Sequence, residues 1–470
     1  MTQATRTEGR CPWLREAIAP GECDAPALTG DRRADVCIVG GGLAGLWTAI
    51  EIKRRDPACA VTIVEADICG GGASGRNSGM VLSQWAKFAA LTRFCGIDGA
   101  LRLAEAFARS PGEIAAFCQA QGIDAEYRQD GWIWGASCAA HIGSWSGILD
   151  SLEAAGRRPF REVSREEIAA LAGTDAFYAG IHDPSAGTIH PGKLVRGLRR
   201  VALAMGVVIH ENTPMTRLVR GPRPAVVTAS GTLRAERIIL TLNAWSLAIR
   251  ELRDAILVIA SDDAVTAPVP DRLERAGYLD KPLISDSQTF VTGYRTTGNR
   301  RINAGVTGGR LGFGSFRGQR FEGPSLREAA IRASIARGHP SLGDIPLVES
   351  WYGPIDRTRS GLPLFGCLPG SSDIFYGYGF SGNGIATTPI GGRILASLAL
   401  GTSDEWSGCG LVRAPERWLP PEPIRYIGAH MVRAAIARQD RLAYAGETPG
   451  FITRRLAALA PGGITTSDAT

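Results

Sequence analysis

Residues 34–65 read ADVCIVGGGLAGLWTAIEIKRRDPACAVTIVE, and this stretch decides the fold. Its first six residues, ADVCIV, are apolar except for Asp35 and are typical of a buried parallel strand. Gly40, Gly42 and Gly45 follow with G-x-G-x-x-G spacing. An amphipathic helix and a second apolar strand are expected next, and the second strand ends in Glu65. A strand, a glycine turn, a helix, a strand and an acidic residue in this order predict a dinucleotide-binding βαβ unit.

Each glycine of this spacing pattern has a physical reason. Gly40 permits the tight turn, Gly42 lets a pyrophosphate approach the backbone at the helix N-terminus, and Gly45 lets helix and strand pack closely. Glu65 lies 20 residues beyond Gly45, a spacing suited to binding both hydroxyls of a ribose. Further contacts with the same cofactor are predicted for the neighbouring residues Leu43, Ala44 and Ala66.

The segment after Glu65 favours a flavin over a nicotinamide cofactor. Residues 68–79 read ICGGGASGRNSG, and the chain stays irregular where a nicotinamide-binding unit would normally start another helix. Such a loop can lie beneath a flavin ring and offer it amides and a cation. FAD is therefore the predicted cofactor, with loop contacts from Ser74, Arg76, Asn77 and Ser78.

Composition limits the class of protein. Hydrophobic residues make up 44% of the 470 residues and charged residues 21%, which excludes a disordered or fibrous chain and suggests two or three domains. No run of 18 apolar residues occurs and residues 1–10 are polar, so neither a membrane span nor a secretory signal is expected. The 59 glycines exceed the usual share and cluster in residues 40–45, 70–79, 305–318 and 377–384, where the backbone can approach a phosphate or a ring.

Charge, cysteine and histidine usage argue against several kinds of partner. The net charge is +6, from 52 basic and 46 acidic residues, and the arginines are scattered, so no nucleic-acid binding is expected. The ten cysteines contain no C-x-x-C and the six histidines have no metal-ligand spacing, so no metal site is expected. Without a signal peptide, the cysteines indicate reduced thiols in a cytoplasmic protein.

Six stretches of the sequence resemble the FAD-dependent D-amino-acid-oxidase-like (DAO) superfamily, which includes glycine oxidase, sarcosine oxidase and the γ-glutamylputrescine oxidases. The form GASGRN, residues 72–77, is most similar to the γ-glutamylputrescine-oxidase-like branch. The six stretches run from about Ala34 to Leu400 and cover most of the chain: ADVCIVGGGLAGLWTAIEI, IVEADICGGGASGRNSG, IHDPSAGTIHPGKLVRGL, ERIILTLNAWS, GLPLFG and GYGFSGNGIATTPIGGRILA.

The resemblance implies a mixed α/β fold, in which a Rossmann-type FAD-binding domain is interleaved with an antiparallel-sheet substrate domain, as in glutathione-reductase-like proteins. The order of elements agrees, because βαβ segments alternate with antiparallel segments along the chain. The predicted boundaries are an N-terminal extension (1–33), a FAD-binding domain (34–90, 183–248 and 350–400), a substrate domain (91–182 and 249–349) and a C-terminal helical appendage (401–470).

Caps, prolines and turn residues predict the bounds of several further elements. Residues 289–295 and 300–306 predict a β-hairpin. The predicted helix starts are Ser110-Pro111, the capping box of Ser164 and Glu167, Pro191, a cap at Ser325, and Thr388 for a helix that ends near Leu400.

A second G-x-G-x-x-G, Gly377–Gly382, has no acid-tipped βαβ unit after it and does not indicate a second dinucleotide site. The resemblance instead places this turn at the flavin, where backbone amides and a helix N-terminus face the pyrimidine carbonyls. The contacts implied are Gly379, Gly382, Asn383, Gly384 and Ile385, with Met215 and Asn243 from other segments. Asn383 departs from a histidine common in the family. Ala386 departs from the lysine that anchors a carboxylate in sarcosine-oxidase-like members, so an arginine must hold any substrate carboxylate.

Four residues are predicted at the substrate side of the flavin: Arg76, Tyr294, Arg295 and Trp351. Arg76 belongs to the glycine-rich loop. Arg295 lies in an alternating strand of the hairpin that, by the resemblance, roofs the substrate site, and it is expected to bind an acidic group distant from the reacting amine. Tyr294 and Trp351 fit a cavity wall and a protein core equally well.

The sequence and the resemblance together predict a FAD-dependent amine or amino-acid oxidoreductase. The substrate would lose a hydride to the flavin and become an imine that water hydrolyses to a carbonyl, with O2 as acceptor and H2O2 as product. A dehydrogenase or reductase with another electron acceptor or partner, and a redox-silent FAD scaffold, remain alternatives at this point. Residues 351–363, the stretch equivalent to the one that carries the flavin-linked cysteine in covalent members, contain no cysteine, so non-covalent FAD is expected. The amine and the oligomeric state stay open.

Overall fold

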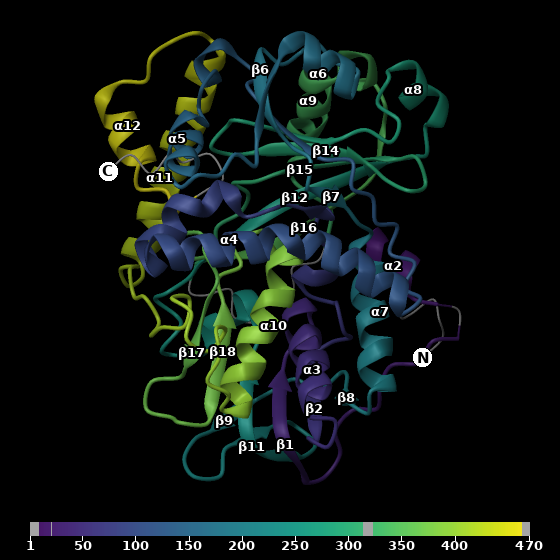
Figure 1. Ribbon diagram of the computed structural model, residues 1–470, viewed down its shortest axis with the longest axis vertical. Helices are drawn as coiled ribbons and strands as arrows, with labels where there is room; N and C mark the ends of the chain where they lie inside the picture. The colour runs from purple at the N-terminus through teal and green to yellow at the C-terminus, as the bar shows by residue number, and fades with distance from the viewer. Residues whose placement is uncertain (1–8, 20, 314–322, 463–470) are drawn as a thin grey trace.

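The computed structural model describes residues 9–19, 21–313 and 323–462, which fold around two large β-sheets (Figure 1). In Figure 1 one sheet lies in the lower half of the molecule and the other in the upper half, and the long helix α4 (Phe88–Ala120) crosses between them. Gly314 and Gly318 of the third glycine cluster, and the ends of the predicted extension and appendage, lie outside the described residues.

The lower sheet contains the predicted βαβ unit. Strand β1 (Arg32–Val39) pairs in parallel with β2 (Val61–Val64) and with β11 (Thr232–Leu240). The strand order is β17-β18-β11-β1-β2-β8, and β9 and β10 extend the sheet from β11. The other strands are β8 (Val208–His210), β9 (Arg217–Val219), β10 (Ala225–Val227), β17 (Leu364–Cys367) and β18 (Ile374–Tyr378). The last four residues of β1 are buried, as expected for a parallel strand covered by helices.

Three helices pack beside one another over this sheet: α3 (Leu43–Arg55), α7 (Pro191–Ala204) and α10 (Gly384–Leu400) (Figure 1). Helix α7 starts at the predicted proline. Helix α10 starts before the predicted Thr388 and continues through Pro389. Pro389 has no N–H, so the Ile385 carbonyl lacks its usual helical donor. The Thr388 hydroxyl donates to this carbonyl at 3.2 Å instead.

The upper sheet has the order β16-β12-β15-β14-β13-β4-β6-β5 and is antiparallel except where β13 and β4 run parallel. Its β14–β15 pair is the predicted hairpin. The strands are β4 (Trp132–Gly135), β5 (Arg161–Ser164), β6 (Ala179–Asp183), β12 (Leu257–Thr266), β13 (Leu283–Asp286), β14 (Thr292–Thr296), β15 (Ile302–Val306) and β16 (Leu347–Arg357). A separate hydrophobic core lies between this sheet and the helices α6 (Arg165–Ala172), α8 (Pro270–Arg275) and α9 (Glu328–Gly338).

Besides the start of α10, two further predicted helix starts are wrong, and the capping box is confirmed. Ser164 caps α6 with Glu167 as the reciprocal partner. Helix α4 passes through Pro111 instead of starting there, because Pro111 is buried inside a long helix whose packing offsets the lost backbone bond. Ser325 does not cap α9, because the residue before this helix is Arg327. The Ser325 hydroxyl accepts the Arg327 N–H at 2.9 Å and donates to Asp262 at 2.7 Å.

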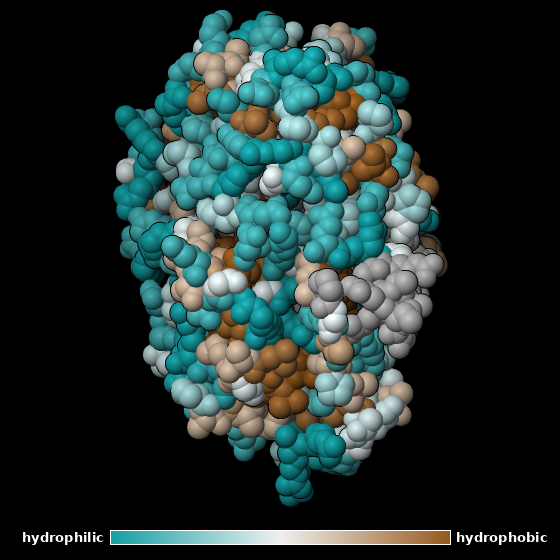
Figure 2. All heavy atoms as spheres, turned by 90° about the vertical axis from the view of Figure 1, so that its right-hand side faces the viewer, coloured by the Kyte–Doolittle hydropathy of each residue, from teal (hydrophilic) through white to brown (hydrophobic). Residues whose placement is uncertain are grey.

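The remaining elements connect the two sheets or cover their edges. They are α2 (Pro12–Ala17), α5 (Ser146–Ala154), α11 (Ile424–Tyr444), α12 (Phe451–Ala457) and the two-stranded pair of β3 (Met80–Val81) with β7 (Gly187–Thr188). Helix α2 packs against α7, and its Trp13 is completely buried. The face that lies on the right of Figure 1 is mainly hydrophilic with separate hydrophobic patches (Figure 2). Among the described residues, no helix has the length and apolar composition needed to cross a bilayer, and no three His, Cys, Asp or Glu side chains are grouped to hold a metal ion.

Candidate FAD site

The glycine turn between β1 and α3 forms a backbone cradle. Gly40 has a φ of +112°, a conformation that favours glycine, and a Cβ on Gly45 would lie 2.0 Å from the Gly40 carbonyl oxygen. Gly42 precedes the first turn of α3, whose N–H groups have no partner within the helix. One of them, the Leu43 N–H, donates to Ser74 Oγ at 2.9 Å. The remaining amides and the positive end of the helix suit a pyrophosphate.

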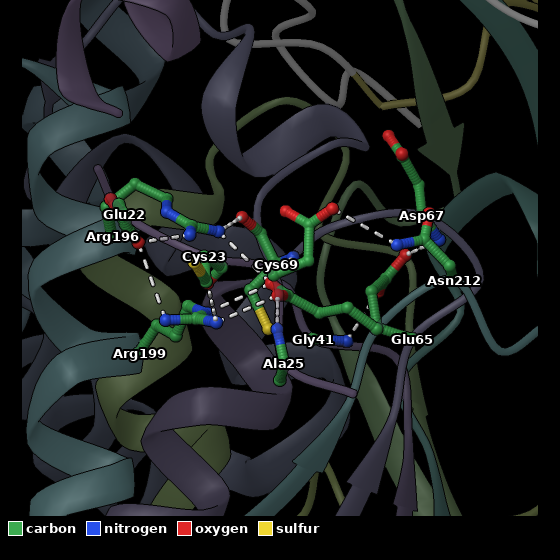
Figure 3. Close-up of polar contacts among 12 residues, drawn as sticks. Glu22, Cys23, Ala25, Gly41, Glu65, Asp67, Cys69, Arg196, Arg199 and Asn212 are labelled. Atoms are coloured by element: carbon green, nitrogen blue, oxygen red, sulfur yellow. Dashed lines mark hydrogen bonds and ion pairs between the residues drawn. The ribbon is translucent and has the colours of Figure 1, made fainter. Parts of the chain in front are cut away.

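Glu65 lies at the end of β2, beside this cradle (Figure 3). Its carboxylate accepts the Gly41 N–H at 2.7 Å and the Asp67 N–H at 2.9 Å. Desolvation raises the pKa of Glu65 to about 7, against the lowering effect of those hydrogen bonds. Each carboxylate oxygen keeps a second lone pair for a hydroxyl donor. Ala66, the next residue, is exposed at the same edge.

Residues 70–79, called the flavin loop below, are held in shape by two of their own side chains. The Arg76 guanidinium donates to the Gly71 carbonyl, with Nη2 at 2.8 Å. Asn77 donates to the Ser74 carbonyl at 2.8 Å and accepts the Gly79 N–H at 2.9 Å. The side chains of Arg76 and Asn77 therefore fold back onto the loop, which keeps the glycine backbone available to a ligand.

Ser78 joins the flavin loop to the upper sheet through a buried carboxyl. Ser78 Oγ donates to the Asp263 carboxylate at 2.9 Å, and Asn303 Nδ2 donates to the same group at 3.0 Å. Burial raises the pKa of Asp263 to about 7 despite these donors. The sequence reasoning missed Asp263, although an acidic pair inside the apolar strand β12 is an unusual feature that could have drawn attention to it.

Arg295, predicted to bind an acidic group of the substrate, bonds backbone carbonyls of the protein in this structure. Its guanidinium donates to three backbone carbonyls, those of Ser78, Ile189 at 3.1 Å and Thr296 at 3.2 Å. Burial, with Arg128 nearby, lowers the pKa of Arg295 to about 10. Only 3% of the residue is exposed. Arg295 is therefore a buried cross-link between the flavin loop and the upper sheet.

The two predicted aromatic residues lie in different environments. Tyr294 alternates with Arg295 along β14, so it points to the opposite face of the sheet. Its hydroxyl bonds His339 Nδ1 at 2.8 Å within the separate core described above, away from the flavin loop. Trp351, in contrast, lies at the flavin loop, where its indole N–H donates to the Arg76 carbonyl at 2.8 Å.

The second glycine turn is fixed by another buried carboxyl that sequence reasoning missed. Asp356, in β16, accepts the Gly379 N–H at 2.6 Å and the Asn243 side-chain amide at 3.2 Å. Burial raises the pKa of Asp356 to about 7. Gly379 and Gly382 both have positive φ, and the chain then enters α10 at Gly384, with Asn383 as the residue before it and Ile385 in its first turn. Met215 lies between β8 and β9, partly buried against the main core.

These features agree with FAD as the ligand, and the comparison with known families decides the assignment. The model of the family described as "DAO: FAD dependent oxidoreductase" matches residues 35–398. The chain belongs to the DAO family. FAD is accordingly the cofactor of this DAO-family enzyme, and the absence of a cysteine from residues 351–363 agrees with the predicted non-covalent binding.

Individual relatives of this DAO-family protein extend the comparison. The chain is 29% identical over 404 residues to "Probable oxidoreductase OrdL" of Rhizobium meliloti (strain 1021), which covers 83% of this chain and 88% of that protein. It is 25% identical over 376 residues to γ-glutamylputrescine oxidoreductase of Escherichia coli (strain K12), covering 79% and 85%. The crystal structure of glycine oxidase from Geobacillus kaustophilus matches with a TM-score of 0.65 and 22% identity, covering 79% of this chain and 96% of that one, which shows a common fold.

Proposed function

We propose that the protein oxidises the C–N bond of an amine or amino acid to an imine, which water hydrolyses to a carbonyl compound, and that O2 accepts the electrons to give H2O2. The observation that carries this proposal is the DAO-family match over residues 35–398, with a backbone cradle at the expected glycine positions. The γ-glutamylputrescine and glycine enzymes among the similar proteins act, by their names, on an amine and an amino acid. Bound FAD supplies the hydride acceptor for such a step.

The residues of this chain would bind and orient the cofactor from three sides. Gly42 and the first turn of α3 would hold the pyrophosphate, and Glu65 would accept hydrogen bonds from a ribose. The N-terminus of α10, with the amides of residues 382–385, would face the pyrimidine carbonyls. A helix N-terminus there would stabilise negative charge that develops on the ring. The short contacts of Asp356 with Gly379 support this role by fixing the turn that leads into α10.

For the substrate, we infer an amine that carries an acidic or polar group at a distance from the reacting nitrogen, or a larger amino acid. Ala386 stands where sarcosine-oxidase-like enzymes place a carboxylate-binding lysine, and its side chain is buried. A bare diamine would meet the positive field of the arginines near the flavin loop, Arg76 among them. The similarity to γ-glutamylputrescine oxidoreductase supports the same direction.

An amine and amino-acid panel tests the reaction class and the acceptor together. Under anaerobic conditions, a true substrate is expected to bleach the visible absorbance of the bound flavin, and admission of air should restore the colour with release of H2O2. Bleaching that air does not reverse would favour a dehydrogenase with another acceptor. Bleaching by NADPH alone, with no response to any amine or amino acid, would reject the proposal in favour of a reductase.

A further inference from the structure

Residues 10–18, called the N-terminal clamp below, lie outside the family match yet are packed into the protein. Cys11, Trp13 and Leu14 are buried and belong to a small hydrophobic cluster of their own. Ile18 of the clamp also belongs to it. The members from other segments come from two sides: Ile68 precedes the flavin loop, while Val265 and Trp351 come from the upper sheet. The clamp therefore fills the space where the flavin loop meets the upper sheet.

The clamp contacts the backbone of the flavin loop directly. Cys11 Sγ donates to the Gly75 carbonyl at 2.9 Å. Leu14 Cδ1 lies 3.3 Å from the position that a Cβ on Gly75 would take, so the loop and the clamp are in close contact. The neighbouring carbonyl, that of Arg76, is bound by Trp351. The loop is thus held at two successive carbonyls, one by the clamp itself and one by a residue that packs on the clamp.

Trp13 is the centre of these contacts. Its ring meets Trp351 edge-on at 5.6 Å and His190 edge-on at 5.2 Å. The Arg295 guanidinium lies 5.7 Å from the ring centroid, within the range of a cation–π contact. Because Arg295 also donates to the Ser78 carbonyl, Trp13 supports the flavin loop from the β14 side as well as from β16.

Ion pairs attach the clamp to three further segments. Arg10 pairs with Asp67 at 2.6 Å, Arg15 pairs with Glu349, and Glu16 pairs with Arg301 at 2.6 Å. These pairs are partly exposed, so each contributes little on its own. They join the segment before the flavin loop to two strands of the upper sheet, β16 at Glu349 and the hairpin at Arg301. The buried cluster around Trp13 therefore contributes most of the free energy that holds the clamp in place, and the ion pairs orient the clamp relative to its neighbours.

A second attachment lies further along the extension and ends on Cys69, directly before the same loop (Figure 3). Glu22 pairs with Arg196 and Arg199 of α7, and both arginines also pair with the buried Glu211. The Glu211 carboxylate accepts the N–H groups of Ala25 at 2.6 Å and of Cys69 at 2.7 Å. Cys69 immediately precedes the flavin loop, so the extension supports both its entrance and its middle.

We propose that the N-terminal clamp fixes the flavin loop against the upper sheet in the conformation that binds FAD, with Trp13 as its central positioning residue. The contacts end on carbonyls of the loop itself, at Gly75, Arg76 and Ser78, and not only on distant core side chains. Loss of the Trp13 ring would therefore release the loop and weaken FAD binding, beyond the general cost of removing a buried aromatic residue.

FAD titration of the apoprotein tests the proposal without any substrate, so its outcome is independent of the proposed reaction. Three variants are compared with wild type: Trp13→Ala, the conservative Trp13→Phe, and Trp145→Ala as the matched control. Trp145 is also buried, but its contacts are with Trp134 and Glu162 in the upper part of the molecule. The readouts are the FAD dissociation constant from flavin fluorescence, the absorption spectrum of the bound flavin, and the melting temperature of the apoprotein.

The Trp13 variants are expected to change FAD binding, whereas the Trp145 control is expected to change only the stability of the apoprotein. Trp13→Ala should raise the FAD dissociation constant by about tenfold or more and alter the flavin spectrum, while Trp13→Phe, which keeps an aromatic ring, should stay within about threefold of wild type. Trp145→Ala should lower the melting temperature with FAD binding unchanged. The proposal is overturned if Trp13→Ala binds FAD as wild type does, or if Trp145→Ala weakens binding equally. Where Trp13→Ala does not fold, Leu14→Ala decides by the same readouts and the same two criteria.

Discussion

Replacing Glu65 by glutamine is expected to weaken FAD binding and to remove most of its pH dependence. In the protein without FAD, desolvation raises the pKa of the Glu65 carboxyl to about 7. Ribose hydroxyls that donate to this group favour its ionised form, so FAD binds the carboxylate better than the neutral acid. Binding that depends on the ionised form is present above the raised pKa and is lost as the pH falls through it.

The size of the effect follows from the titration of this one group. With a pKa of about 7, roughly nine-tenths of Glu65 is ionised at pH 8 and roughly one-tenth at pH 6, so the FAD dissociation constant of the wild type should rise about tenfold between them. Glutamine keeps an acceptor oxygen but loses the charge. At pH 8, the lost charge-assisted contacts, at about 1.5–3 kcal/mol, correspond to about 10- to 150-fold weaker binding by Glu65→Gln.

Fluorescence titration of the apoproteins with FAD, at constant ionic strength from about pH 6 to pH 8, measures both effects. Asp263 and Asp356 also have pKa values raised to about 7, so a slope in the wild type alone would not identify the group. Glu65→Gln isolates it, because only the contribution of residue 65 disappears in that variant. A glutamine variant with the tenfold slope of the wild type, or with wild-type affinity at pH 8, would refute the assignment of Glu65.

Gly42→Val is expected to yield protein without bound flavin, because a Cβ at residue 42 would lie 2.8 Å from Ser74 Oγ and the side chain would enter the pyrophosphate path. The visible absorbance of the purified variant measures its flavin content. Gly428→Val is the control, because a Cβ at residue 428 meets nothing within 4 Å. Asp263→Asn should gain stability relative to wild type as the pH rises. Because the pKa of Asp263 is raised to about 7 in the folded state, the free energy of unfolding of the wild type falls by up to about 4 kcal/mol between about pH 4 and pH 8, whereas asparagine does not titrate. A stability difference between the two proteins that is independent of pH would contradict this. Arg295→Met should lower the melting temperature, because it leaves backbone carbonyls without a donor. The decrease should be smaller in the Asp263→Asn background, where no buried carboxylate needs a neighbouring cation. Equal decreases in melting temperature in both backgrounds would show that the two residues are not coupled.

The parts of the fold that could be predicted from sequence are those determined by neighbours along the chain. The βαβ unit depends on the glycine spacing and on two apolar runs, and β1, α3 and β2 form where these predict them. The Ser164 capping box is a local hydrogen-bond pattern and is also present. Pro111 shows the limit of local reasoning, because the packing of a long buried helix outweighs the preference of proline for a helix start.

The arrangement of the site depends on contacts between residues far apart in the sequence, which local patterns do not encode. Alternation predicts that Tyr294 and Arg295 point to opposite faces, but only the packed structure shows that Arg295 faces the flavin loop and what it bonds there. The Ser78–Asp263 bond joins residues 185 positions apart. Trp13 carries no motif at all, so its place between the loop and the upper sheet could not be read from the chain.

The strand order of the lower sheet also sets when this sheet can be completed during synthesis. Strand β1 is complete at Val39, but its neighbour β11 ends only at Leu240. Strand β18, which pairs with β11, ends at Tyr378, and α10, which packs against α3, follows it. At about 5–20 residues per second, a ribosome needs roughly 20 to 70 s to make the intervening chain. Throughout that interval α3 lacks its neighbour α10, and β1 lacks β11 until Leu240 has been made. Gly379 and Gly382 of the second glycine turn and the N-terminus of α10 come after Tyr378, so the two glycine turns are present together only in a nearly complete polypeptide.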